Sequence, residues 1–182
     1  ASFDTPSYHG LRVNTNKISV ADFLKQFPYE LTPIPWTTDG FYYQESDPVS
    51  KHPYYYAGLY YIQEPSAMLP AESLPIEPYD KVLDVCAAPG GKSTKLAVKL
   101  QNTGVLFAND ISASRTRALL RNVELFGFTN AFVANETPAR LRDRFPEFFH
   151  KKRPFRSRSH QTHVTFENVK QLWQLIDTRP SH

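Results

Sequence analysis

VLDVCAAPGGK, residues 82–92, joins a buried apolar strand to a helix through a turn of alanines, a proline and glycines. The small side chains of residues 87–91 let a ligand approach the backbone closely. The helix that begins near Lys92 offers unpaired N–H groups and the positive end of its dipole, which suit an anion or a carboxylate. The stretch therefore predicts a ligand-binding loop.

Known glycine-containing loops limit the identity of that ligand. A phosphate-binding P-loop needs a glycine five positions before its Gly-Lys pair, and Cys86 stands there. A dinucleotide fingerprint needs three spaced glycines, whereas this loop has only the adjacent Gly90 and Gly91. Nucleoside triphosphates and nicotinamide cofactors are therefore disfavoured. A tight strand-to-helix connection without any ligand remains an open alternative.

The next segment adds a second strand and an acidic residue at its end. Residues 105–108, VLFA, are typical of a short strand buried in a parallel sheet, and they lead into Asn109 and Asp110. Asp110 lies nineteen residues after Gly91, close to the spacing at which an acid binds ribose hydroxyls in nucleoside-binding folds. The alternative is that Asp110 caps the following helix, which Ser112 could also do.

A helix and a third strand follow. The helix is predicted over residues 112–126, with Leu119, Leu120, Val123 and Phe126 on one face. The strand is predicted over residues 131–134. Three parallel strands in the usual order 3-2-1 would leave the first strand with an open apolar edge. Open edges favour association, so we expect marginal stability and oligomerisation through that edge.

Several segments together resemble the RNA (cytosine-5)-methyltransferases of the Sun type, and most closely their bacterial ribosomal-RNA branch, RsmF. The resemblance covers about residues 6–150, and CAAPGGK is its most specific part. The matching segments occur in the order of the family: GLRVNT (10–15), HPYYYAGLYYIQEPSAML (52–69), VLDVCAAPGGKST (82–94), ANDIS (108–112) and TNAFVANETPARL (129–141).

The resemblance implies an S-adenosyl-L-methionine site in the N-terminal half of a Rossmann-like methyltransferase sheet. In the family, Asp110 would hold the ribose, and Asn135 and Glu136 would flank the adenine. Many relatives have an aspartate where Thr137 stands. The residues expected to wrap the cofactor are Cys86, Ala87, Ala88, Pro89, Gly90, Gly91 and Lys92.

The chemistry of the family requires a cysteine thiolate that attacks carbon 6 of cytosine and so activates carbon 5. The family supplies its cysteines in a Pro-Cys and a Thr-Cys motif, and neither motif occurs in these 182 residues. The only cysteine, Cys86, ends a buried strand, where thiols are usually inert. We therefore assign no catalytic residue and expect this chain to be inactive by itself.

The resemblance ends sharply after residues 148–150, where KKRPFRSRSHQTHV replaces the apolar fourth strand of the family. We expect no strand in this segment, and we expect the tail to be out of register with the relatives, as a reading-frame slip would produce. Residues 165–177 have the spacing of an amphipathic helix. His160 and His163 lack further ligands, so no metal site is predicted.

Charge offers little support for nucleic-acid binding before the tail. Residues 1–75 hold 4 basic and 8 acidic side chains, residues 76–150 hold 10 and 8, and residues 151–182 hold 7 and 2. The ribosomal-RNA partner is therefore implied by the resemblance alone. The basic cluster of the tail favours a solvated segment over an RNA contact; it comprises Lys151, Lys152, Arg153, Arg156 and Arg158.

The first 75 residues predict a smaller unit. A strand is expected over residues 11–19, a helix over 20–27, an extended edge over 31–36 and a second strand over 40–46. This pattern resembles part of the ferredoxin-like, RNA-contacting module of the family. Core packing is the expected use of most of its tyrosines, with base stacking as the alternative; they are residues 42, 43, 54, 55, 56, 60 and 61.

The sequence thus predicts four parts: a partial α+β module (1–50), a connecting segment (51–75), the cofactor-binding half-domain (76–150) and a basic tail (151–182). The favoured function is a fragment of a ribosomal-RNA cytosine-5 methyltransferase with a cofactor loop and no catalytic cysteine. The alternative is a non-catalytic module that binds RNA or protein. A methyltransferase of other chemistry would need an Asn-Pro-Pro-Tyr motif, and none occurs. The absence of a signal peptide or an apolar span implies a cytoplasmic location.

Overall fold

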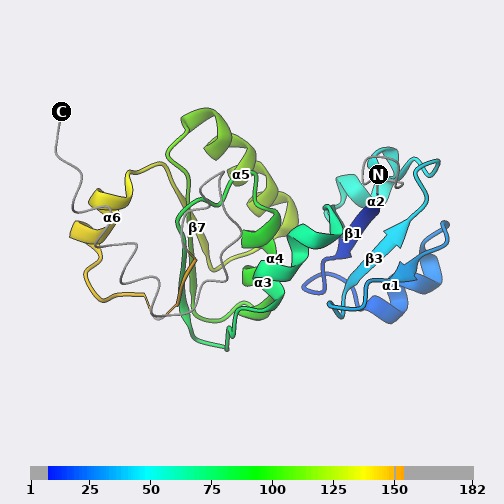
Figure 1. Ribbon diagram of the computed structural model, residues 1–182, viewed down its shortest axis with the longest axis horizontal. Coiled ribbons are helices and arrows are strands. Elements are labelled where there is room, and N and C mark those ends of the chain that lie inside the picture. The colour runs from blue at the N-terminus through cyan, green and yellow to red at the C-terminus, as the bar shows by residue number, and fades with distance from the viewer. Residues whose placement is uncertain (1–7, 150, 154–182) are drawn as a thin grey trace, which may run out of the picture.

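A computed structural model describes residues 8–149 and 151–153, with side chains over residues 8–149. It contains an antiparallel sheet in the order β2-β3-β1-β4 and a parallel sheet in the order β7-β6-β5-β8. The layers follow one another across the molecule in Figure 1: α6, the parallel sheet, α4 and α5, the antiparallel sheet, and α1. The predicted tail helix, His160 and His163, and Arg156 and Arg158 lie outside the described residues.

The N-terminal module is built on the antiparallel sheet. Its strands are β1 (His9–Val13), β2 (Thr32–Pro33), β3 (Gly40–Tyr43) and β4 (Tyr60–Ile62). Helix α1 (Val20–Gln26) begins at Ser19, whose hydroxyl accepts a hydrogen bond from the Asp22 amide at 3.1 Å. Two short helical turns, η1 (Val49–Lys51) and α2 (Pro53–Tyr56), precede β4.

The predicted elements of this module are present, with two corrections. The first strand ends at Val13 instead of continuing to residue 19, because Lys17 and Ile18 turn back to bond the Asn14 carbonyl. Strand β4 lies in the segment expected to be a mere connection, and it pairs with β1. Its three residues stand within a tyrosine-rich run that has no alternation of apolar and polar side chains, so the period of a strand is hidden.

The two faces of the antiparallel sheet have different partners, as the alternation of a strand requires. Leu11, Val13, Phe41 and Tyr60 pack on α1 in the core of the module. Gly10, Arg12 and Gly40 lie on the other face, toward η2 (Pro65–Met68) and α3 (Leu69–Glu72). The second face is therefore an interface within the chain.

The second unit is a parallel α/β sheet. Its strands are β5 (Lys81–Asp84), β6 (Val105–Asn109) and β7 (Ala131–Ala134), which alternate with α4 (Gly91–Lys99), α5 (Ala113–Phe126) and α6 (Pro138–Arg144). The order β7-β6-β5 confirms the predicted order of the three strands. Together with the helices it confirms the α/β class.

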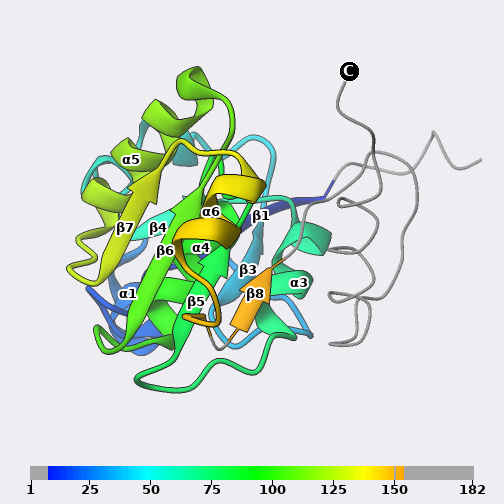
Figure 2. The same ribbon diagram turned by 90° about the vertical axis from the view of Figure 1, so that its left-hand side faces the viewer.

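Helices cover both faces of the parallel sheet. The larger core on one face contains Leu96 of α4, Leu100 directly after that helix, and Leu119 and Phe126 of α5. Leu141 of α6 joins the smaller core on the other face, which also contains Leu83, Val85 and Phe149. Figure 2 shows α6 lying across that second face. Within the described ranges, no helix is long and apolar enough to cross a membrane.

The edge of β5 is not open. Strand β8 (Lys151–Arg153) pairs with it in parallel, from Val82 to Asp84, beside β5 in Figure 2. The expectation of no strand after residue 150 is therefore wrong. A Lys-Lys-Arg segment lacks the apolar side chains of a buried parallel strand, but the ladder is formed by backbone groups that every residue carries. Association of copies through this side of the sheet stays a prediction, with β8 as the edge strand.

The two cores are expected to unfold together. Leu11→Ala and Leu96→Ala remove fully buried side chains from the N-terminal and the parallel-sheet core, so each should lower the free energy of unfolding by about 2–5 kcal/mol. Urea unfolding followed by circular dichroism and by fluorescence should show one transition in both variants. Leu24→Ala, at an exposed position of α1, is the control and should change the free energy by less than about 0.5 kcal/mol. Two separate transitions would contradict this expectation.

Candidate cofactor site

The predicted site residues lie at the carboxyl edge of the parallel sheet. Residues 85–90 connect β5 to α4, Asp110 directly follows β6, and Asn135 and Glu136 directly follow β7. Because parallel strands end at the same edge, the fold brings these three segments together. This edge is where open α/β sheets bind their ligands.

The loop after β5 places its two glycines in different environments. Gly90 precedes α4 with φ at +118°, a conformation that L side chains rarely adopt, so the loop needs glycine there. Gly91 starts α4, and an added Cβ would lie 3.1 Å from Gln63 Nε2 and 3.1 Å from Tyr61 Cε1. The side of Gly91 on which a Cβ would stand therefore faces the N-terminal module.

Asp110 takes the capping role, one of the two alternatives that the sequence left open, and its ribose contact stays a prediction. Its side chain is 2% exposed; Oδ1 accepts the Ser112 amide at 2.9 Å, and Oδ2 accepts from Arg115 Nη2 at 2.7 Å. The carboxylate thus satisfies a donor at the start of α5, whereas the Ser112 hydroxyl makes no cap bond. A carboxylate accepts about four hydrogen bonds, so Asp110 retains capacity for ribose hydroxyls.

The residues after β7 contact the Asp110 segment. Asn135 Nδ2 donates to the Asp110 carbonyl at 2.7 Å, and the Glu136 carboxylate pairs with Arg140 at 3.1 Å. Both side chains are therefore adjacent to the predicted ribose site and are already engaged within the protein. Their contact with a ligand stays a prediction.

Asn109 organises this edge, and the sequence analysis assigned it no role. Its side chain is fully buried, and Nδ2 donates to the carbonyls of Val85 at 3.2 Å and Glu136 at 2.9 Å. Oδ1 accepts the Glu136 amide at 2.9 Å. One amide thus ties together the ends of all three strands. An amide residue before the acid is the only sequence signal of this role.

Ile111 is a second residue that the sequence analysis missed. It directly follows Asp110, and its side chain is 62% exposed. It offers an apolar surface next to the predicted ribose site. Such a surface suits an aromatic base, for which the glycine loop supplies no apolar slot.

Charges on the α4 side come from Lys92 and Glu64. Burial opposes ionisation of Glu64, but hydrogen bonds from Ser66 and the Ala67 amide, together with the charge of Lys92, lower the pKa of the Glu64 carboxyl. Asp84, at the end of β5, accepts from Ser93 Oγ at 2.7 Å and so joins the strand to the first turn of α4. At the start of α4, Ser93 is thus bonded to Asp84, and Lys92 lies near the charge of Glu64.

Cys86 and the tyrosines are the remaining residues that the sequence analysis considered. Cys86 is half-buried and packs against the core that contains Leu83 and Val85. Among the tyrosines, Tyr60 is fully buried, Tyr43, Tyr54 and Tyr55 pack against the core of the module, and Tyr56 is 65% exposed. Within the described part of the chain, no group of three or more potential ligands could hold a metal ion.

A polar hollow of about 620 Å³ lies between the N-terminal module and α4. Asp39, Glu72, Lys95 and Lys99 line it, and none of the predicted cofactor residues does. Lys95 Nζ lies 2.8 Å from a carboxylate oxygen of Asp39 and 2.8 Å from one of Glu72, so the charges in the hollow neutralise one another. The hollow is therefore separate from the candidate site.

The parallel sheet and its carboxyl-edge loops define the class, a Rossmann-like methyltransferase fold. A "methyltransferase homolog protein" from Pyrococcus horikoshii superposes with a TM-score of 0.78 at 31% identity, over 96% of this chain and 59% of that one. The structure of "NSun6" from the same organism "with SFG" superposes with a TM-score of 0.66 at 20% identity, over 75% and 60%.

Sequence comparison then gives the family. Residues 1–65 match the "N-terminal domain of 16S rRNA methyltransferase RsmF" and residues 71–151 match "16S rRNA methyltransferase RsmB/F". The "ribosomal RNA small subunit methyltransferase F" of Vibrio cholerae is 41% identical over 143 residues, which are 74% of this chain and 30% of that protein. An Escherichia coli protein of the same name is 38% identical over 82% of this chain and 33% of its own length.

The chain belongs to the RsmB/F family of 16S rRNA methyltransferases, in its RsmF branch. The family resemblance inferred from the motifs is thereby confirmed, and methyltransferases of this family use S-adenosyl-L-methionine as methyl donor. The chain spans about a third of the length of the curated relatives that it matches.

Asn109 can be tested by a substitution that keeps its shape. Asn109→Asp replaces the donating amide by an oxygen that faces two carbonyls, so the free energy of unfolding should fall by about 1–3 kcal/mol or more. Urea unfolding monitored by circular dichroism measures this change. Asn102→Asp, at an exposed position with a single side-chain partner, is the control and should be nearly neutral. Equal losses in both variants would refute the role of Asn109.

Proposed function

We propose that this chain binds S-adenosyl-L-methionine at the carboxyl edge of its parallel sheet, as the cofactor-binding part of a ribosomal-RNA cytosine-5 methyltransferase. The observation that carries the proposal is the position of Asp110. Its buried carboxylate follows β6, next to the glycine loop that opens α4. An acid in that position suits a ribose with two adjacent hydroxyl donors.

The groups present fit the three chemical parts of the cofactor. The amides at the start of α4 and the charge of Lys92 suit its carboxylate, because a helix start attracts anions. Asp110 suits the ribose. The exposed Ile111 offers an apolar surface for adenine, and Asn135 and Glu136, which follow β7, are the polar residues that we assign to its edge. When bound, the cofactor supplies an electrophilic methyl group.

Arg115 is the residue whose contacts a bound ribose would affect most directly. It is largely exposed, and its guanidinium bonds both Asp110 Oδ2 at 2.7 Å and the Ala88 carbonyl at 3.3 Å. It therefore bridges the ribose site to the cofactor loop. A ribose that reached Oδ2 would share or replace this contact, and its hydroxyls would supply a hydrogen bond to the buried carboxylate in return.

Methyl transfer to cytosine is not expected from these 182 residues by themselves. The sole cysteine, Cys86, packs with the apolar core on the α6 face, whereas α4 lies on the opposite face. A nucleophile needs an accessible thiolate, and an apolar surrounding disfavours ionisation. We assign Cys86 a structural role. The relatives are ribosomal-RNA methyltransferases, so the partner we propose for the whole protein is ribosomal RNA and its proposed location is the cytoplasm.

Calorimetric titration with S-adenosyl-L-methionine tests cofactor binding directly. Asp110→Asn replaces charge-assisted hydrogen bonds by weaker neutral ones, so the dissociation constant should rise about tenfold. Asp143→Asn, which changes an exposed aspartate on α6, is the matched control and should leave the constant within twofold. Adenosine should compete with the cofactor, since it retains the ribose. Absence of heat with the unsubstituted chain would refute the proposal and favour a non-catalytic binding module.

The structural role of Cys86 predicts that no covalent RNA adduct forms. Incubation of the chain with S-adenosyl-L-methionine and a ribosomal RNA that contains 5-azacytosine should leave no protein–RNA species on a denaturing gel. Cys86→Ser should bind the cofactor like the unsubstituted chain. An adduct that forms with the unsubstituted chain and is lost in Cys86→Ser would overturn the assignment.

A further inference from the structure

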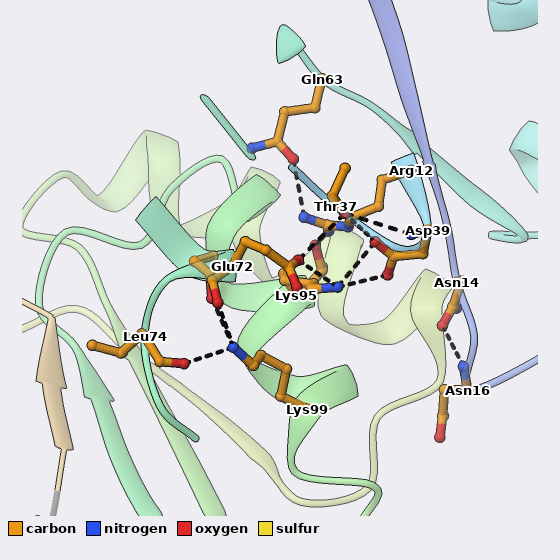
Figure 3. Close-up of polar contacts among 12 residues, drawn as sticks. Arg12, Asn14, Asn16, Thr37, Asp39, Gln63, Glu72, Leu74, Lys95 and Lys99 are labelled. Carbon is orange, nitrogen blue, oxygen red and sulfur yellow. Dashed lines mark hydrogen bonds and ion pairs between the residues drawn. The ribbon is translucent and has the colours of Figure 1, made fainter. Parts of the chain in front are cut away.

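Arg12 is a buried cation that points away from the core of its own module. It lies in β1 between Leu11 and Val13, which both face the module core, so its side chain emerges on the opposite face. The residue is 1% exposed. The strand position paired with it is Gly40. Figure 3 shows the side chain running from β1 toward α4.

The guanidinium bonds the first turn of α4. Nη1 donates to the Gly91 carbonyl at 2.8 Å, and Nη2 donates to Thr94 Oγ1 at 2.6 Å. Nη1 also donates to Gln63 Oε1 at 3.0 Å, and the Tyr61 ring lies 5.9 Å from the guanidinium carbon. Gly91 and Thr94 stand three residues apart on one helical turn, so the two nitrogens hold both ends of that turn.

Over residues 8–149, no carboxylate forms a hydrogen bond with Arg12. Burial lowers the pKa of its guanidinium, and the charge of Asp39 partly offsets that effect. Asp39 itself bonds Lys95, one residue further along α4, at 2.8 and 2.9 Å. A buried cation is costly unless its hydrogen bonds are satisfied, and the acceptors of Arg12 are those of the turn and Gln63. Movement of this turn would therefore leave a buried charge without its acceptors.

The N-terminal module also fills the space beside the loop. Gln63 and Tyr61 occupy the direction in which a side chain at position 91 would point. A side chain at position 91 would thus crowd Gln63 and Tyr61, which would have to shift by a few tenths of an ångström. Two independent observations, the bonds of Arg12 and the packing at Gly91, place the module against the residues that begin α4.

We propose that Arg12 is a positioning residue for the methyl-donor site. From the N-terminal module it fixes the first turn of α4, and with it the loop of residues 85–90, in the geometry that receives the cofactor. This inference rests on the proposed binding of S-adenosyl-L-methionine. It makes the N-terminal module a structural part of the cofactor site, in addition to any contact of that module with RNA.

The test compares Arg12→Lys with Asp39→Asn. An ammonium group keeps the charge but cannot reach the Gly91 carbonyl, Thr94 Oγ1 and Gln63 with the fixed fork of a guanidinium. Titration calorimetry should show a rise of about tenfold in the dissociation constant of S-adenosyl-L-methionine for Arg12→Lys. Amide hydrogen exchange of the chain without cofactor should be faster over residues 86–95. Asp39→Asn weakens the same interface beside Lys95 without touching Gly91 or Thr94, and it should change neither quantity more than twofold.

Thr94→Val is the second variant, which removes one acceptor and leaves Arg12 in place. It should raise the dissociation constant in the same direction by a smaller factor. Equal losses of affinity in Arg12→Lys and Asp39→Asn would show that Arg12 merely joins the modules, and would overturn the inference. If the unsubstituted chain binds no cofactor, the proposed function fails, while exchange over residues 86–95 that is unchanged in Arg12→Lys separately refutes the positioning role.

Discussion

The buried polar interface between the N-terminal sheet and α4 is the constraint on which the rest of the structure depends. Arg12 and Lys95 are both nearly inaccessible, and each bonds groups on the other side of the interface: Arg12 the first turn of α4, and Lys95 the carboxylate of Asp39. Buried charges stay ionised at acceptable cost only when every donor is matched. Of the two, Arg12 bonds the first turn of α4 and therefore fixes the start of that helix relative to β1. The loop that leads into α4 inherits that geometry.

The same interface explains why the chain has a glycine pair where a dinucleotide fold has spaced glycines. Gly90 serves the backbone, since its φ of +118° lets the chain turn into the helix. Gly91 serves packing, since Gln63 and Tyr61 lie where its side chain would be. The glycine pair suggests space for a ligand, but the N-terminal module fills the space beside Gly91.

Local patterns in the sequence were sufficient for strands β5, β6 and β7 of the parallel sheet. The apolar runs at residues 82–85 and 105–108 and the amphipathic pattern of α5 predicted the strands, their order and the position of Asp110 at the sheet edge. Partnerships across long sequence distances were not predictable in this way. In the pairing of β4 with β1, Arg12 lies opposite Tyr61, 49 positions away. Arg12 also bonds Gly91, 79 positions away, and no periodicity encodes either contact.

Strand β8 shows a second limit of predicting strands from side-chain patterns. A basic tripeptide was excluded as a strand because buried parallel strands are usually apolar on both faces. The backbone of Lys151–Arg153 nevertheless completes the ladder along Val82–Asp84. Side-chain character therefore indicates how deeply a strand is buried, whereas an unpaired strand edge accepts any segment whose backbone can reach it.

Asn109 and Cys86 show how position on the sheet decides chemistry. Both stand near a strand end at the same edge, yet the Asn109 amide joins three backbone segments and the Cys86 side chain packs into an apolar cluster. A residue at this edge acts on a ligand only if its polar group retains capacity beyond its protein contacts. Asp110 meets that condition, because two of its acceptor sites are used and a carboxylate offers about four. We therefore assign the proposed ligand contact of this edge to Asp110, at the end of β6.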